Sequence, residues 1–365
     1  MTRKSGAANS APGIGRRTVL KGVGATAGAF TVGVPALTGQ VAATTPTELC
    51  EKELLADQTV DVGSVKVFKN GDVKYTTTSG WVITQIHLHV DENGDPIPIT
   101  GGGNPKVGQF EHQESFSPPV KSVTVPSGET RYTGKCGKPI AAHAVVLPVD
   151  GLELVTNGGF ESPAVTTDQE WDIFDSGTDG LGWAVEWFDG STTFEGQTRP
   201  TTPHLELHGG VNDWDPADGN QHAELDTDWD GPGGSLNNEP ASVKIFQELD
   251  TSGSPYCQIK YSWSPRPGHD DNRLQVKWDG TVVNTHSADG SENENTVWTD
   301  EVLVVASPSD LTKLEFIETG GSDSLGMFLD AVSVQCISGD GEETAWGKGT
   351  PFDGGSWAMH FECDC

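Results

Sequence analysis

Polar and apolar residues alternate along short segments of this chain, and the spacing of apolar residues that marks a helix is almost absent. In RLQVKWDGTVV, Leu274, Val276 and Trp278 fall on one face of a strand, and Asp279 and Gly280 follow as a hairpin turn. Similar runs recur over residues 150–338, separated by turns rich in Gly, Pro and Asp, and the first of them is LELV at 152–155. This succession predicts an all-β sandwich.

Further strands lie on both sides of that region. SVKVF, SGWVITQIHLHV and AAHAVVL precede a turn at Asp150–Gly151, and ETAWG and SWAMHFE close the chain. The closing piece is too short to fold alone, and a domain inserted in a loop is tolerated where its two ends lie close together. The sequence therefore predicts a discontinuous β domain, residues 44–149 plus 339–365, interrupted by the sandwich of residues 150–338.

The amino-terminal segment indicates export. Arg16 and Arg17 stand directly before the uncharged stretch 22–37, and small residues follow up to Ala43. This pattern predicts a twin-arginine signal peptide over residues 1–43. The alternative is a membrane anchor, but the stretch is shorter than the roughly 20 residues that a spanning helix needs. We expect an extracellular or cell-surface protein whose mature chain has no membrane span.

The net charge of the chain limits the environment in which the protein works and the partners that it can bind. The chain has 53 acidic and 22 basic residues, and loss of the signal removes five basic ones, which takes the formal net charge from −31 to about −36. Such a chain repels itself in dilute salt, whereas molar salt shortens the Debye length to about 3 Å. The composition favours a haloarchaeal protein over an acidic, calcium-rich protein from ordinary medium. The negative sign of the net charge excludes nucleic acid as a partner.

The six cysteines fit an oxidising compartment. An even number of cysteines in an exported chain indicates disulfides, and the connectivity stays open. If pairing occurs within groups, Cys257 joins Cys336 inside the sandwich, and Cys50 and Cys136 join the carboxy-terminal Cys363 and Cys365. The last pairing would fasten the end of the chain to the first domain. The alternative for Cys363 and Cys365 is a metal site.

Two resemblances follow from longer motifs. SGWVITQIHLHV, GNPKVGQFEH, IAAHAVV and ETAWGKGTPFDGGSWAMHF resemble an uncharacterised secreted β domain of bacterial and archaeal surface proteins, for which no activity is implied. LVTNGGFESP, GWAVEW, DGNQHAELD, IFQELDTS, WTDEVLVV and GMFLDAVSV resemble, in this order, galactose-binding-like jelly-roll domains. Plant cell-wall proteins of unknown function and anchored bacterial surface proteins share that domain, and carbohydrate-binding modules are more distantly similar.

The second resemblance implies a structural calcium ion. In related sugar-binding sandwiches calcium ties the NGGFE segment to the last strand, which here corresponds to Gly159, Glu161 and Asp330. The alternative is that the two acids are ordinary solvated side chains. A second calcium candidate is the alternating set Asp226, Asp228 and Asp230, although Asn237 stands where a calcium-binding helix-loop-helix would have its Glu.

Aromatic residues supply the candidate ligand contacts. Trp187, Trp214 and Trp229 stand among Gly, Asp and Asn, where loops are expected, and an exposed indole can stack on a sugar ring. The alternative is burial in the core, which we expect for three other tryptophans: Trp263, Trp278 and Trp298. Arg266 is a candidate partner for a ligand carboxylate, or it pairs with Asp270 or Asp271.

Four histidines form a metal candidate in the first domain. His87 and His89 lie two apart and share one face of a strand, and His143 and His360 come from other strands. Converging imidazoles would bind zinc or copper, while the alternative is that each packs or hydrogen-bonds separately.

No Gly-x-Ser-x-Gly, His-Glu-x-x-His or phosphate-binding glycine loop occurs, so the sequence predicts no enzyme, and two function classes come before an enzyme, which is a distant third. The favoured one is a non-catalytic, calcium-stabilised protein that binds polysaccharide or a surface glycan through the sandwich. The alternatives are a structural component of the cell envelope that contacts other proteins, and an enzyme acting on glycans.

Overall fold

The structure is a computed structural model that describes residues 46–92, 94–234 and 239–364. The predicted signal peptide, with Arg16 and Arg17, lies outside the described residues, as do Asn237 and Cys365. No helix among the described residues is long and apolar enough to cross a membrane.

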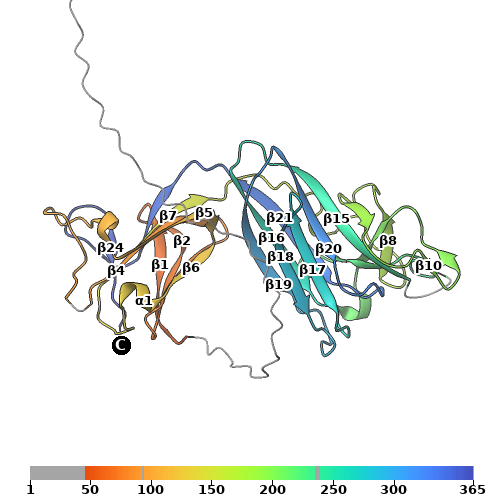
Figure 1. Cartoon of the computed structure of the whole chain (residues 1–365), viewed down its shortest axis with the longest axis horizontal. Coiled ribbons are helices and arrows are strands. Elements are labelled where there is room, and N and C mark those ends of the chain that lie inside the picture. Colours follow the sequence, from red (N-terminus) through yellow and green to blue (C-terminus); the bar gives the residue numbers. More distant parts are fainter. Residues whose placement is uncertain (1–45, 93, 235–238, 365) are drawn as a thin grey trace, which may run out of the picture. The chain divides into compact units, whose positions relative to one another are not determined.

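An eight-stranded antiparallel sheet combines strands from both ends of the described chain (Figure 1). Its order is β5 (His112–Val120), β4 (Trp81–Val90), β7 (Ile140–Pro148), β22 (Glu343–Gly347), β1 (Glu48–Ala56), β2 (Val60–Phe68), β3 (Val73–Thr77) and β6 (Ser122–Val125). The late strand β22 pairs with β7 on one side and with β1 on the other. ETAWG is therefore an interior strand of a sheet whose other members precede residue 150.

Both faces of this sheet are packed. One buried cluster includes Leu54, Tyr75, Ile86 and Phe361, and another includes Phe110 and Trp346 on the opposite face. The second cluster is covered by short elements: η1 (Val107–Gln109), β23 (Thr350–Pro351) and β24 (Met359–His360). The expected strand SWAMHFE is thus reduced to β24, and a short helix, α1 (Ser127–Thr130), follows β6.

Residues 150–338 form two further sheets. The first has the order β19 (Thr299–Ala306), β16 (Tyr256–Ser264), β21 (Phe328–Ile337), β13 (His222–Glu224), β12 (His204–His208) and β8 (Trp171–Asp175). The second contains β14 (Asp226–Asp228), β15 (Pro240–Asp250), β20 (Leu311–Glu318), β17 (Asn272–Trp278) and β18 (Thr281–Ala288), with β9 (Ala184–Trp187) also paired to β15. Smaller elements are β10 (Thr193–Phe194), β11 (Gln197–Thr198) and η2 (Val211–Asp213).

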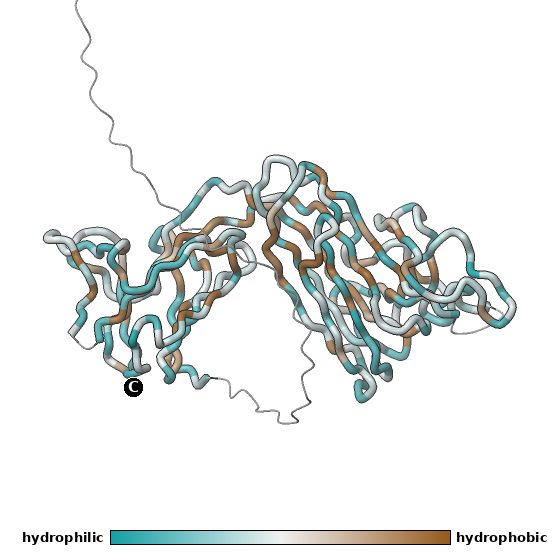
Figure 2. The backbone as a smooth tube through the Cα atoms, in the orientation of Figure 1, coloured by the Kyte–Doolittle hydropathy of each residue, from teal (hydrophilic) through white to brown (hydrophobic). Residues whose placement is uncertain are grey.

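One hydrophobic core joins the two sheets face to face. Leu207 and Leu329 of the first sheet belong to the same buried cluster as Val276 and Phe316 of the second. Figure 2 shows the hydrophobic positions concentrated along the strands, with hydrophilic residues in the connecting loops. The protein is therefore all-β, with a jelly-roll sandwich inserted in a discontinuous β domain, as predicted. The expected strand at residues 152–155 is only an isolated bridge between Glu153 and Gln335.

Disulfides fasten both regions. Cys257 and Cys336 are bonded directly across the paired strands β16 and β21. Cys50 in β1 is bonded to Cys363, which ties the end of the chain to the first sheet. Cys136 is also disulfide-bonded. These bonds confirm the prediction of disulfides and leave the alternative of a metal at Cys363 without support.

Candidate functional site

A buried polar layer lies on the outer face of the first sandwich sheet. Because side chains alternate along a strand, Leu205 and Leu207 of β12 enter the core while its polar residues point the other way. The same alternation in β13 sends Ala223 inward and its two neighbours outward. The outward residues are all less than 5% exposed: His204, Glu206, His208, His222 and Glu224. Loops therefore cover this face of the sheet, and its polar groups need partners within the protein.

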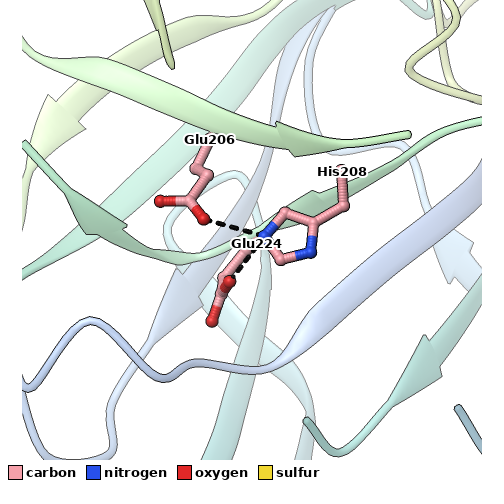
Figure 3. Close-up of side chains that lie close together, drawn as sticks. All are labelled: Glu206, His208 and Glu224. Atoms are coloured by element: carbon pink, nitrogen blue, oxygen red, sulfur yellow. Dashed lines mark hydrogen bonds and ion pairs between the residues drawn. The ribbon is translucent and has the colours of Figure 1, made fainter. Parts of the chain in front are cut away.

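Glu206, His208 and Glu224 form the centre of that layer (Figure 3). Nε2 of His208 lies 2.7 Å from Oε1 of Glu206 and 2.9 Å from Oε2 of Glu224. The strand register produces this meeting, since Glu206 is directly opposite Glu224 across β12 and β13. Among the described residues these three side chains form the only group of its kind, with ligand-type atoms all within 4.8 Å of one another.

Each carboxylate is anchored through its other oxygen. The backbone N–H of Asp228 donates to Oε2 of Glu206 at 3.0 Å, and that of Gly326 donates to Oε1 of Glu224 at 2.7 Å. The guanidinium of Arg266 contacts Oε2 of Glu224 and is mostly buried. Both carboxylates are thus held rigidly, with one oxygen each turned towards His208.

Burial and the charges of neighbouring groups shift the pKa values of the two acids in opposite directions. Burial, reinforced by the charge of Glu224, raises the pKa of Glu206 to about 7. Burial also acts on Glu224, but the Arg266 charge and the bond from His208 outweigh it and lower the pKa of Glu224. Burial opposes the imidazolium form of His208, yet its two carboxylate partners raise the pKa of His208. The layer therefore favours one firmly ionised carboxylate, Glu224, beside one that is readily protonated.

Two hollows adjoin this layer. A cavity of about 210 Å³ is lined by Trp171, Glu206, His208, Val211, Asp228, Arg266 and Ser324. An open groove of about 420 Å³, called here the 209–220 groove, is lined by Glu170, Gly209, Gly210, Asp213, Trp214, Asp215, Pro216, Gly219 and Asn220. Trp214 lies between the two hollows, because its ring stacks on His208 with an interplanar angle of 8°.

Hydrogen bonds hold the wall of the 209–220 groove. Asn295 and Thr296 bond to Asp215, and the indole N–H of Trp298 donates to the Asp215 carbonyl at 2.7 Å. Farther along the loop, Glu161 accepts the backbone N–H groups of Asn220 and Gln221 at 2.6 and 3.0 Å. The groove is therefore built on a fixed loop rather than a loose one.

The predicted residues Gly159, Glu161 and Asp330 do come together. A Cβ atom at Gly159 would lie 3.9 Å from Cγ of Glu161 and 4.0 Å from Oδ1 of Asp330. Asp330 is fully buried and accepts the N–H groups of Ala217 and Asp218, each at 2.9 Å. Burial raises the pKa of Asp330 to about 7. Asp330 is thus not a solvated side chain, whereas Glu161 is exposed, and both accept hydrogen bonds from the loop that forms the groove.

The second predicted calcium set is not assembled in the described part of the chain. Asp226 and Asp228 lie in strand β14 rather than in a loop, and these two with Asp230 are not within 4.8 Å of one another. Asp226 is fully buried, and burial raises its pKa to about 8. Burial and the neighbouring Asp228 also raise the pKa of Glu239 to about 7. Asp230 lies in the turn that follows strand β14.

The tryptophan predictions need correction. Trp229 is only 2% exposed and Trp214 only 8%, so neither presents an open ring face. Trp187 is partly buried, with its N–H bonded to the Pro200 carbonyl and Arg199 over its ring. Loop composition misled here, because Gly- and Asp-rich loops fold back over the sheet and bury their aromatic residues.

Of the three tryptophans that we expected in the core, two pack in or against it and one does not. Trp278 is in the core and 3% exposed, and Trp263 packs against the core while partly buried. Trp298 is outside the core cluster and supports Asp215 instead. Arg266 pairs with Glu224, which is distant in sequence, rather than with either neighbouring acid of its turn.

Two of the four histidines of the first domain meet. His87 and His143 are opposite one another across β4 and β7, and their Nδ1 atoms lie 3.1 Å apart. His89 contacts the Asp95 carbonyl, and His360 packs on Phe352. The described residues therefore contain a histidine pair and no four-histidine cluster.

Sequence reasoning missed the central group itself. Glu206, His208 and Trp171 lie outside the quoted motifs, and Glu224 was given no role within DGNQHAELD, although HLELH and HAE show a usable signal. Their polar residues all fall on the same side of an apolar alternation, which indicates a polar layer on one sheet face. That the layer is buried depends on loops far away in sequence.

Comparison with known proteins leaves the family open. No family model matches the chain, and no curated protein matches it in sequence. A native family 35 carbohydrate-binding module from Clostridium thermocellum is 10% identical, with a TM-score of 0.23, over 45% of this chain and 96% of that one. A family 61 carbohydrate-binding module in complex with β-1,4-galactotriose is 13% identical, with a TM-score of 0.24, over 51% and 99%. A cleaved adhesin domain of Lys-gingipain is 17% identical, with a TM-score of 0.24, over 51% and 99%.

Proposed function

We propose that this protein is a non-catalytic, exported carbohydrate-binding protein whose ligand lies in the 209–220 groove. The proposal rests on the polar residues that line this groove and on the hydrogen bonds that fix its loop. Its volume of about 420 Å³ falls in the range of small-ligand sites, roughly 300–1,000 Å³.

The groove is rich in hydrogen-bond acceptors. Exposed carboxylates of Glu170, Asp213 and Asp215 and the amide of Asn220 line it. Sugar hydroxyl groups supply the matching donors. Two adjacent glycines in the wall, Gly209 and Gly210, leave the backbone open to a ligand. This chemistry favours a neutral or amino sugar and disfavours an anionic one, because a ligand carboxylate would meet like charges.

Preorganisation is the second support. A loop that is already ordered loses less conformational entropy when a ligand binds. Glu161, Asp330 and Trp298 fix the loop from three directions. Weak individual contacts to hydroxyl groups can then add up to measurable affinity.

We further propose that Glu161 and Asp330 bind a structural calcium ion. Their carboxylates come from segments far apart in sequence and meet beside Gly159, which leaves space between them. Within the described residues, Oε2 of Glu161 and Oδ1 of Asp330 each accept a single hydrogen bond, so each keeps a lone pair for a hard cation. Calcium would add a further link between the 159–161 segment and β21.

Export by the twin-arginine pathway completes the proposal. The cross-links Cys50–Cys363 and Cys257–Cys336 are of a kind that persists in oxidising surroundings. Arg16 and Arg17 provide the signal motif.

The test is binding of the mature protein to a panel of soluble and insoluble polysaccharides in molar salt, with calcium or with a chelator. We expect saturable binding that Asp215→Asn and Asn220→Ala each weaken about tenfold, by loss of a hydrogen bond worth about 1.4 kcal/mol. Asp279→Asn is the matched control, because Asp279 is an exposed acid of the β17–β18 turn. Absence of binding to every glycan would refute the proposal and favour a structural role in the cell envelope.

A further inference from the structure

The group formed by Glu206, His208 and Glu224 has the spacing of a metal-ligand set. Two ligands that each lie about 2.1 Å from one ion, at right angles, are about 3 Å apart. The separations of 2.7 and 2.9 Å between Nε2 of His208 and the two carboxylate oxygens are close to that value. All three residues are at most 4% exposed, so they are not a patch of surface acids.

Two carboxylate oxygens converge on a single nitrogen of His208. Nε2 of a histidine carries at most one hydrogen, while two carboxylate oxygens converge on it (Figure 3). Oε1 of Glu206 takes the hydrogen bond with Nε2, while Oε2 of Glu224, which accepts from Arg266, faces the same nitrogen without a hydrogen from it. A cation placed among the three atoms would serve both oxygens and the nitrogen lone pair.

The groups around these three side chains hold them as the outer shell of a metal site holds its ligands. Outer-shell bonds orient ligating side chains and raise metal affinity. Asp228 and Gly326 donate backbone N–H groups to the far oxygens of Glu206 and Glu224. His208 is oriented by ring packing on Trp214 and Phe328, since its Nδ1 has no partner among the described residues.

Charge balance points the same way. Three buried acids, Glu206, Glu224 and Asp226, lie near one buried cation, Arg266. Oδ1 of Asp226 has no hydrogen-bond partner among the described residues. Buried carboxylates are costly to ionise, and the guanidinium of Arg266 contacts only Glu224. A divalent ion would stabilise the ionised forms of both Glu206 and Glu224.

The cavity of about 210 Å³ would let an ion reach these ligands and would leave some of its coordination positions open. Glu206, His208 and Arg266 all line it, together with Trp171. Three protein ligands leave room for water or an added ligand on the cavity side.

We propose that Glu206, His208 and Glu224 bind one divalent first-row transition-metal ion that opens onto this cavity. One imidazole nitrogen and two carboxylate oxygens suit Zn²⁺, Mn²⁺, Fe²⁺ or Co²⁺, whereas Ca²⁺ prefers oxygen ligands alone. This site is separate from Glu161 and Asp330, and it does not depend on glycan binding.

The test uses the full mature chain, stripped with a chelator and then given one equivalent of Co²⁺ in molar salt. We expect one ion per chain after dialysis, a visible d–d absorption band, and displacement of that band by Zn²⁺. His208→Asn and the near-isosteric Glu206→Gln should each weaken Co²⁺ binding about 100-fold or more, since even outer-shell changes cost 10- to 100-fold. Circular dichroism checks that each variant is folded.

His222→Asn is the matched control, because His222 is equally buried in the same layer but outside the group. It should retain Co²⁺ as the wild type does. The proposal is overturned if the wild type keeps no stoichiometric ion. It is also overturned if retention survives in both His208→Asn and Glu206→Gln, or is lost equally in His222→Asn. Glycan binding is measured separately, in a sample given calcium, and tests the proposed function independently.

Discussion

Acidification should destabilise the first domain through His143. Its side chain is 6% exposed and packs on Trp346, with ring centroids 4.7 Å apart. Its Nδ1 lies 3.1 Å from Nδ1 of His87, a distance that accommodates one shared hydrogen and not two. Burial, with a smaller contribution from the His87 charge, lowers the pKa of His143 to about 3.

The size of the effect follows from that pKa. The ordinary value is 6.5, and each unit of difference is worth about 1.4 kcal/mol, so the full effect is about 5 kcal/mol. Because the folded-state pKa is the lower one, the unfolded chain binds the extra proton between about pH 6.5 and pH 3. The free energy of unfolding therefore falls as the pH falls through this window, by about 1.4 kcal/mol per unit.

The assay is urea unfolding in molar salt at several pH values, for the wild type and for His143→Phe, which keeps a ring against Trp346. We expect the stability difference between them to change by about 2 to 3 kcal/mol between roughly pH 6.5 and pH 4.5. The comparison cancels opposing groups such as Glu318, whose pKa burial raises to about 7. His87→Ala should keep most of the wild-type slope, because burial is the larger cause. Parallel curves for the wild type and His143→Phe would refute the reasoning.

Other predictions concern the sandwich. Replacing Cys257 and Cys336 by Ser should cost about 2 to 5 kcal/mol in urea unfolding, and an unchanged midpoint would contradict the role given to that bond. Trp229→Ala should cost about 3 to 5 kcal/mol while leaving glycan affinity of the folded fraction unchanged, because the ring is buried. Calcium at 100 times its Kd should stabilise the wild type by about 2.7 kcal/mol and Glu161→Ala hardly at all, measured by thermal unfolding. Equal stabilisation of both proteins would place the ion elsewhere.

Local patterns determined much of this fold. Alternation over 272–278 and the Asp279–Gly280 turn predicted β17 and its hairpin with β18, since both depend on neighbouring residues. The alternation in HLELH likewise fixed which residues of β12 share a face. The convergence of Gly159, Glu161 and Asp330 was reached through resemblance to related sandwiches.

Only the tertiary structure decided what covers each face. Trp214 and Trp229 lie in segments rich in turn residues, yet the loops fold over the sheet and bury them. Glu206, His208 and Glu224 became one group because β12 and β13 pair in a particular register, and Arg266 arrives from a turn 42 residues beyond Glu224. The chain's own pattern specifies strands and their faces, because those depend on contacts between near neighbours. Which buried charges meet depends on strand register and loop packing, which no short stretch of sequence contains.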